Sequence, residues 1–314
     1  MIDRRFLVPA LVGTLVCLVL PTFLPEYYVE LVTKIVIFAL FAMSLDLLLG
    51  YTGLASLGHA AYFGIAAYAT GLLALRQDWP MVFALPAGIL VAAVTAALFG
   101  LLALRARGSY FLMITFALAQ VLWGIVFGWS ALTGGEDGLP GVPRPDFGAS
   151  SPQASTAMFY YFTLVLAGAG TFALVRIVNS PFGHALRGIR ESESRMLALG
   201  YNVWRYKYVS FILGGAFAGL AGCLYVYLNR FASPDYVHVI RSAEVLLMVI
   251  LGGAGTLVGP AIGAALIVLF ENLVSAYSDR WVMLLGLIYI AVALFAPDGL
   301  AGLWRDRLRR RAPS

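Results

Sequence analysis

Long apolar runs constrain this chain more than any other feature. We expect an all-α integral membrane protein, because a helix that crosses a bilayer needs about 20 mostly apolar residues and most of these runs reach that length. The run at 243–256 is shorter, which indicates a short or broken helix shielded by neighbouring protein. About ten transmembrane helices are predicted, at 6–24, 29–49, 53–75, 80–104, 109–129, 156–178, 207–228, 243–256, 257–274 and 281–297.

The composition agrees with a protein whose main solvent is lipid. Hydrophobic residues make up 61% of the 314 residues and charged residues 12%, and the mean hydropathy is +0.88. Soluble domains carry about twice that share of charge, so a soluble enzyme, a nucleic-acid binder and a disordered protein are all excluded. Both cysteines, Cys17 and Cys223, fall within predicted spans, which argues against a disulfide scaffold and against a metal site.

The basic residues predict an orientation for these spans. Most of the 21 lie at the start, in the loops before spans 109–129 and 207–228, and in the tail, which places both termini in the cytoplasm. This bias also requires 243–256 to cross, and it explains the net charge of +5 as an orientation signal. We expect an uncleaved N-terminal anchor at 6–24. The basic residues assigned to the outer side are Lys34, Arg76, Arg144, Arg230, Arg241 and Arg280.

We expect one transmembrane domain over 1–314, with a basic cytoplasmic tail at 298–314 and two loops long enough to hold structure. The periplasmic loop, 130–155, is rich in Gly, Pro and Ser, which favours turns; it either meets an external partner or simply connects two spans.

The cytoplasmic loop, 179–206, predicts a helix that begins at Ser180-Pro181 and stops at Gly200. Its predicted apolar face holds Leu186, Ile189, Met196 and Leu197, and its polar face holds Arg187, Arg190, Glu191, Ser194 and Arg195. Such a helix suits docking to another protein, and the alternative is a helix lying among lipid headgroups.

The motifs of enzymes and nucleotide-binding proteins are missing from the sequence. Neither the phosphate-binding pattern G-x-x-x-x-G-K-[ST] nor H-E-x-x-H occurs, and the three histidines have unrelated settings. We therefore expect no catalytic residue, no metal and no cofactor on this chain. If transport is driven by ATP, a separate subunit binds that ATP.

Polar residues inside the spans are the candidates for a substrate path, because ionisable groups are costly in hydrocarbon. The alternative is that they bond helices together or reach the membrane surface. Two glycine-rich stretches, 50–60 and 251–264, resemble each other and are typical of broken helices beside a transport path. The pairs Gly215/Gly219 and Gly259/Gly263 predict close helix packing within the subunit. The path candidates are Asp46, Thr52, Ser56, His59, Glu244 and Glu271.

Three segments together resemble the LivM-type permeases of bacterial ABC importers for branched-chain amino acids. They are LLLGYTGLASLGHAAYFGIAAYATGLL (47–73), ALRGIRESESRMLALGYNVWRYKYVSFILGGAFAGLAGCLY (185–225) and EVLLMVILGGAGTLVGPAIGAAL (244–266). The resemblance implies a second, LivH-type permease, two cytoplasmic ATPases of LivG and LivF type, a periplasmic binding protein, and the inner membrane as location. It also implies that the cytoplasmic helix is a coupling helix. The coupling candidates are Arg187, Arg190, Glu191, Glu193 and Gly200.

The function implied is import of leucine, isoleucine or valine by alternating access, driven by ATP on partner subunits. Related permeases suggest urea, short amides or other amino acids as alternative substrates. A different class remains open: a self-sufficient secondary transporter or channel that uses Asp46, His59 or Glu271 as a proton or ion site. A non-transporting membrane scaffold would leave these polar groups without a purpose.

Overall fold

The computed structural model describes residues 21, 24–145, 148, 151–275, 283–284, 286–287, 290 and 299. The predicted spans at 6–24 and 281–297 and the tail at 298–314 fall outside this part, apart from a few single positions. The long helices are α2 (Glu26–Asp46), α3 (His59–Arg76), α4 (Met81–Ala103), α5 (Ser109–Gly128), α7 (Pro152–Val178), α10 (Val203–Asn229), α11 (Val239–Gly252) and α12 (Val258–Ser275). The short helices and strands are η1 (Leu47–Thr52), α6 (Ser130–Thr133), η2 (Gly135–Asp137), β1 (Leu139–Pro140), α8 (Pro181–Glu191), α9 (Glu193–Ala198), β2 (Phe231–Ala232) and η3 (Pro234–Tyr236).

Each predicted span between 29 and 274 corresponds to one of the long helices. Among the residues that the structure describes, six helical segments are long and apolar enough to cross a membrane: Glu26–Thr52, Met81–Ala103, Ser109–Gly128, Pro152–Val178, Val203–Asn229 and Val258–Ser275. The other two, α3 and α11, are 18 and 14 residues long. The short helix predicted at 243–256 is thus present as α11. It begins four residues earlier than expected.

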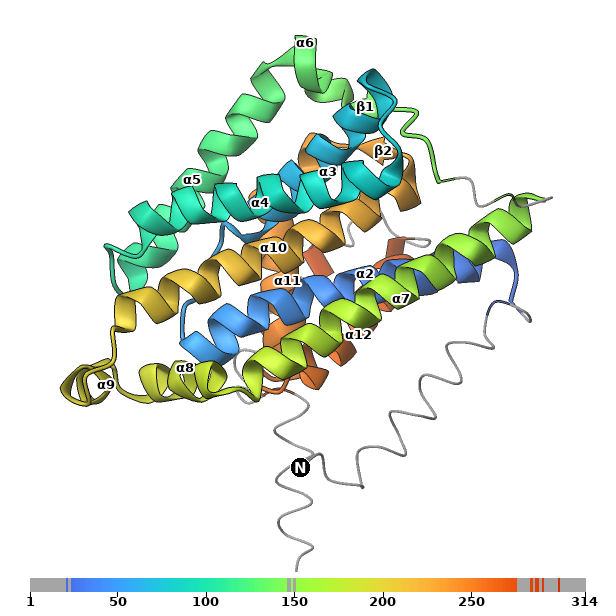
Figure 1. Cartoon of the computed structure of the whole chain (residues 1–314). Helices are drawn as coiled ribbons and strands as arrows, with labels where there is room; N and C mark the ends of the chain where they lie inside the picture. Colours follow the sequence, from blue (N-terminus) through green and yellow to red (C-terminus); the bar gives the residue numbers. More distant parts are fainter. Residues whose placement is uncertain are drawn as a thin grey trace, which may run out of the picture.

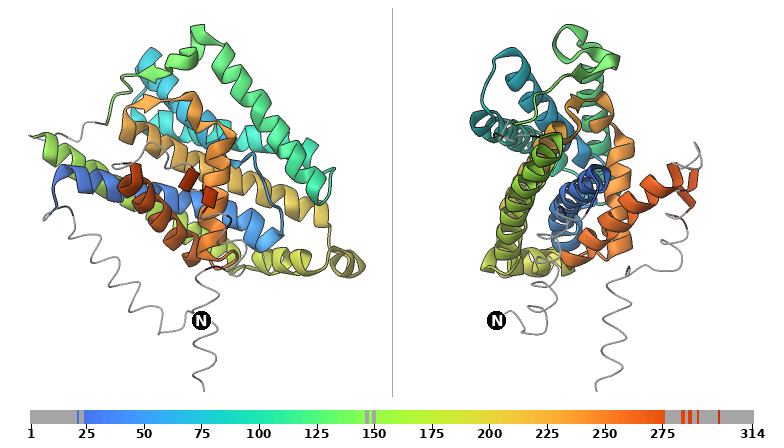
Figure 2. Two further views of the ribbon diagram at one scale, coloured as in Figure 1. Left: turned by 180° about the vertical axis from the view of Figure 1, so that it is seen from behind. Right: turned by 90° about the vertical axis from the view of Figure 1, so that its right-hand side faces the viewer.

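Two helices form the centre of the bundle. The candidate membrane helices differ in how much of an apolar stretch of 18 residues is buried. The buried share is 67% for the segments that contain α2 and α10, but 22% for α5 and 28% for α4 and α7. Figure 1 shows α10 between the α3–α4 layer and the α2–α7 layer, and Figure 2 shows α11 and α12 behind them. The core therefore lies along α2, α3 and α10, and α4, α5 and α7 form its outer wall.

Small residues bring α10 close to its neighbours, as the glycine pairs predicted. A side chain added at Gly215 would lie 2.3 Å from the Cβ of Ala96, and one at Gly219 would lie 2.5 Å from the Cβ of Ala92. Without side chains at these positions, α10 approaches α4 to within backbone contact. Because lipid tails are as apolar as the side chains, helices in a bilayer associate through close van der Waals packing and not through the hydrophobic effect.

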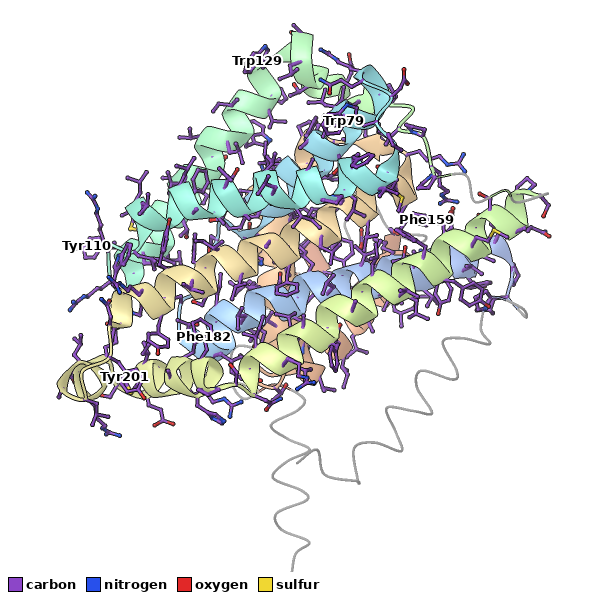
Figure 3. The ribbon with its side chains drawn as sticks, viewed as in Figure 1. Trp79, Tyr110, Trp129, Phe159, Phe182 and Tyr201 are labelled. Carbon is purple, nitrogen blue, oxygen red and sulfur yellow. The ribbon has the colours of Figure 1, made fainter. Side chains whose placement is uncertain are left out.

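The outward faces of α4 and α5 are apolar. Leu90, Val94 and Leu98 of α4 are all at least half exposed. Figure 3 places the exposed Tyr110 and Tyr201 toward the end that carries α8, and the exposed Trp79 and Trp129 toward the opposite end. Trp and Tyr are enriched where a membrane protein meets the two interfaces, so these four side chains fit a bundle embedded in a bilayer.

The loop at 130–155 packs against the helices at the end far from α8. β1 pairs antiparallel with β2, with Leu139 opposite Ala232 and Pro140 opposite Phe231. The buried Arg144 donates hydrogen bonds to Glu30 at 2.9 Å, to Thr156 at 3.1 Å and to the carbonyl of Leu228 at 3.1 Å. This arginine ties the loop to α2, α7 and α10, so the loop is an integral part of the fold.

The segment 179–206 forms two helices, where the sequence predicted one. Ser180 caps α8 with Pro181 in the first turn, as expected, but the helix stops at Glu191. Ser192 is extended, and its hydroxyl accepts a hydrogen bond from the backbone N–H of Arg195, which starts α9. A serine that caps a new helix competes with continuation of the old one. The break changes the register, which explains why Leu186, Ile189 and Met196 are buried while Leu197 is exposed.

Candidate functional site

The two glycine-rich stretches, which lie 200 residues apart in the sequence, meet beneath α8. A Cβ at Gly50 would lie 2.2 Å from the backbone nitrogen of Gly255 and 2.0 Å from Oδ1 of Asp46. Only glycine leaves room for this approach. We call this contact the glycine joint, formed by Asp46, Gly50, Arg190, Gly255 and Leu257. It connects the end of α2, the α11–α12 turn and the α8–α9 segment.

Asp46 holds the two halves of the joint together and is completely buried. Its Oδ1 accepts a hydrogen bond from the N–H of Gly255 at 2.6 Å, and its Oδ2 accepts one from the N–H of Leu257 at 3.1 Å. The carboxylate lies at the start of α12, where a negative charge interacts favourably with the helix dipole. Leu257 has a φ of 57°, a strained value for a residue with a side chain, so Asp46 also stabilises a strained turn.

Two arginines of α8 point toward the bundle. Arg190 donates a hydrogen bond from Nη1 to the carbonyl oxygen of Gly50. Arg187 lies over the ring of Tyr51, with its Cζ 5.2 Å from the ring centroid, and donates a hydrogen bond to the carbonyl of Val178. Both arginines therefore attach α8 to this chain's own helices. Their part in coupling to an ATPase stays a prediction.

The chain between α2 and α3 is irregular at the joint. Residues 47–52 form a π-helical turn in which the Thr52 hydroxyl donates a hydrogen bond to the carbonyl of Leu47 at 2.9 Å. Such turns are rare and frequently occur at functional sites. The buried Ser56 hydroxyl accepts a hydrogen bond from the N–H of Gly58, the residue before α3. Both path candidates are thus used to shape this break between helices.

His59 has a structural setting at the start of α3. The Ser44 hydroxyl donates to the carbonyl of Phe41 at 2.6 Å, so the Ser44 oxygen accepts from His59 Nε2 at 2.8 Å. The imidazole is stacked on the Phe41 ring and is completely buried. Its Nδ1 has no hydrogen-bond partner among the described residues. A sealed histidine fits the interhelical alternative better than a proton-carrying role.

The remaining coupling candidates lie on α9 and its edges. Glu193 forms an ion pair with Lys207 of α10, and Glu191 is exposed. Gly200 has a φ of 84°, and the N–H of Tyr201 bonds the carbonyl of Met196 while that of Gly200 bonds Leu197. This left-handed cap requires glycine and ends α9 where the sequence predicts. The side of α8–α9 that faces away from the bundle, which carries Glu191, is exposed.

Glu244 and Glu271 belong to a second group of charges, away from the joint. Glu271 of α12 pairs with Lys34 of α2 at 2.9 Å, and Glu244 pairs with Arg241 on α11 at 2.7 Å. Charge counting assigns Lys34 and Arg241 to the outer side, so neither partner is among the path candidates predicted from the sequence. A signal was present, because Lys34 lies within the apolar run at 29–49, five residues after its start. We call these four residues the charge cluster.

Comparisons with known proteins agree with this architecture. The chain is 27% identical over 306 residues to the high-affinity branched-chain amino acid transport system permease protein LivM of Salmonella typhimurium, covering 90% of this chain and 72% of that protein. It is 30% identical over 126 residues to the corresponding LivH permease of Escherichia coli, covering 39% of this chain and 40% of that one.

The fold also has a solved counterpart. A metal-chelate-type ABC transporter in an inward-facing conformation superposes with a TM-score of 0.53 at 15% identity, over 92% of this chain and 97% of the other. A family model described as the permease component of the branched-chain amino acid transport system matches residues 27–294. The chain therefore belongs to this family of transport permeases.

Proposed function

We propose that this chain is one membrane-spanning subunit of an ABC importer for leucine, isoleucine and valine in the bacterial inner membrane. The observation that carries the proposal is the α8–α9 segment, which displays a free outer side at one end of a multi-pass bundle. Its inner side is attached through Arg190 to the joint between α2 and the α11–α12 turn. A force that a docked partner exerts on α8 is therefore passed directly to two breaks between membrane helices, the one between α2 and α3 and the one between α11 and α12.

The partners follow from this arrangement and from the family. A LivH-type permease pairs with this chain, two ATPases of LivG and LivF type dock on the α8–α9 side, and a periplasmic binding protein docks on the opposite end. The local match to LivH supports a homologous second permease. Lipid covers the apolar wall of α4 and α5 wherever the second permease does not. The chain itself holds no cofactor, and ATP is used by the partner ATPases.

The mechanism is alternating access with both termini in the cytoplasm and ten spans. Closure of the ATPase pair around ATP moves α8, and Arg190 transmits that movement to η1 and to the start of α12. The pathway then opens toward the binding protein and accepts substrate, and hydrolysis resets it. A self-sufficient proton-driven carrier is less well supported, because Asp46 and His59 are sealed and each has a structural partner.

Reconstitution of the whole assembly tests the proposal. Proteoliposomes should contain both permeases and both ATPases, with ATP inside and the loaded binding protein outside. We expect leucine uptake that stops when ATP or either ATPase is omitted, and ATP hydrolysis that rises with leucine-loaded binding protein. Accumulation of solute by this chain alone under an ion gradient would contradict the proposal. Parallel assays with urea and a short amide distinguish the alternative substrates.

A further inference from the structure

The charge cluster lies inside a membrane-spanning segment, nearer to its first end than to its middle. Lys34 Nζ and Arg241 Cζ are each 5.9 Å from the ring centroid of Phe38, so both cations flank this buried ring. Lys34 is about 12 Å from the start of the Glu26–Thr52 segment and about 27 Å from its end, at 1.5 Å per residue. Charges at this depth are costly and rare, so they require a reason.

The cluster is balanced in charge and is supplied by three helices. Lys34 comes from α2, Arg241 and Glu244 from α11, and Glu271 from α12. Two cations and two anions give no net preference for a cationic or an anionic ligand. Such an arrangement instead matches a small molecule that carries one charge of each sign.

The side chains of the charge cluster are also partly exposed. The exposed fractions of the side chains are 24% for Lys34, 17% for Glu271, 18% for Arg241 and 10% for Glu244, whereas Asp46 is sealed. In the described part of the chain, the hydrogen bonds use one donor of each cation and one oxygen of each carboxylate. Lys has three N–H donors and Arg has five, so capacity remains for a ligand.

We propose that the charge cluster binds the ammonium and carboxylate groups of a zwitterionic amino acid on its way through the permease. The carboxylate of the ligand takes hydrogen bonds from Lys34 and Arg241, and its ammonium donates to Glu244 and Glu271. The ion pairs of the structure hold these groups in place when no ligand is present. This inference rests on the proposed function, since it names the chemistry that the path recognises.

Uptake by the reconstituted assembly tests the inference, with rates normalised to the amount of assembled complex. Lys34→Gln, Arg241→Gln, Glu244→Gln and Glu271→Gln should each lower leucine uptake about tenfold or more, because each removes a charge-assisted hydrogen bond to the ligand. Tyr27→Phe is the matched control. It breaks the Tyr27–Asn272 hydrogen bond at the exposed end of the same α2–α12 contact and should leave uptake near the wild-type rate.

A charge exchange separates ligand binding from a structural ion pair. The double variant Lys34→Glu with Glu271→Lys keeps the pair but moves each charge to the other helix. We expect its leucine uptake to stay as low as that of the single variants. Uptake restored by the exchange, or unaffected by the single neutralisations, overturns the inference while the proposed function stands. Wild-type transport of urea without transport of any amino acid overturns both.

Discussion

The glycine joint and the charge cluster both hold ionisable groups in the membrane-spanning helices, but they hold them in opposite ways. Asp46 is sealed and is satisfied by two backbone N–H groups, which fix the turn before α12. The cluster pairs side chain with side chain and keeps part of each one exposed. A carboxylate bound to backbone holds helices in position, whereas charges that bind only one another are free to exchange partners with a ligand.

Removing the charge of Asp46 should have the largest effect on stability. Asp46→Asn keeps the size but turns one acceptor into a donor that faces a backbone N–H, which leaves buried groups unpaired. We expect a loss of about 3 kcal/mol, seen as a lower thermal unfolding midpoint of the purified protein in detergent. An unchanged midpoint would show that the carboxylate does not hold the α11–α12 turn.

Adding one methyl group at Gly50 should come next. The new Cβ overlaps the Asp46 carboxylate and the backbone of Gly255, so Gly50→Ala should destabilise the protein by about 2 kcal/mol. The matched control is Gly124→Ala on α5, where a Cβ meets no atom within 4 Å. Equal unfolding midpoints for the two variants would contradict the close approach of the two glycine-rich stretches.

Removing one charge from the charge cluster should lower the stability of the protein less than removing the charge of Asp46. Lys34→Gln removes one partner of an ion pair that is partly in contact with solvent, so we expect a loss of about 1 kcal/mol. The same unfolding assay measures it beside Asp46→Asn. If Lys34→Gln proved the more destabilising of the two, the cluster would be the structural element and the comparison would be reversed.

The ion pair between Glu193 and Lys207 should matter least. It joins α9 to α10 with Glu193 39% exposed, and exposed pairs contribute about 0.5 kcal/mol. Lys207→Gln should therefore leave the unfolding midpoint within about one degree of the wild-type value. A large decrease would mean that α9 is held to the bundle mainly by this pair.

Much of the fold could be predicted from the sequence because the bilayer imposes one rule on every span. Each run between 29 and 274 is apolar, and each forms a helix, since a helix satisfies the backbone hydrogen bonds in lipid within a single segment. The caps at Ser180 and Gly200 were predicted because their geometry is local. The break at Ser192 was not, because a serine next to two glutamates fits a helix interior as well as a cap.

The site was harder to predict because it depends on contacts across the sequence. The likeness of the stretches at 50–60 and 251–264 was visible, but not that Gly50 touches Gly255. Asp46 was recognised as a candidate, while its backbone partners required the fold. Lys34 and Arg241 were missed because counting charges by loop places a basic residue near a span end outside the membrane, whereas α11 begins at Val239.

Water access to the charge cluster tests the account most directly. Ile240 of α11 lies one turn before Glu244 on the same side of the helix and is 48% exposed, and Val94 of α4 is 50% exposed on the apolar wall. Single cysteines at these positions, in a chain without Cys17 and Cys223, can be treated with a charged thiol reagent in the assembled transporter. We predict that Ile240→Cys reacts, that leucine slows the reaction, and that Val94→Cys stays unreactive in lipid. An unreactive Ile240→Cys, or equal reaction at both positions, would contradict an aqueous path at the charge cluster.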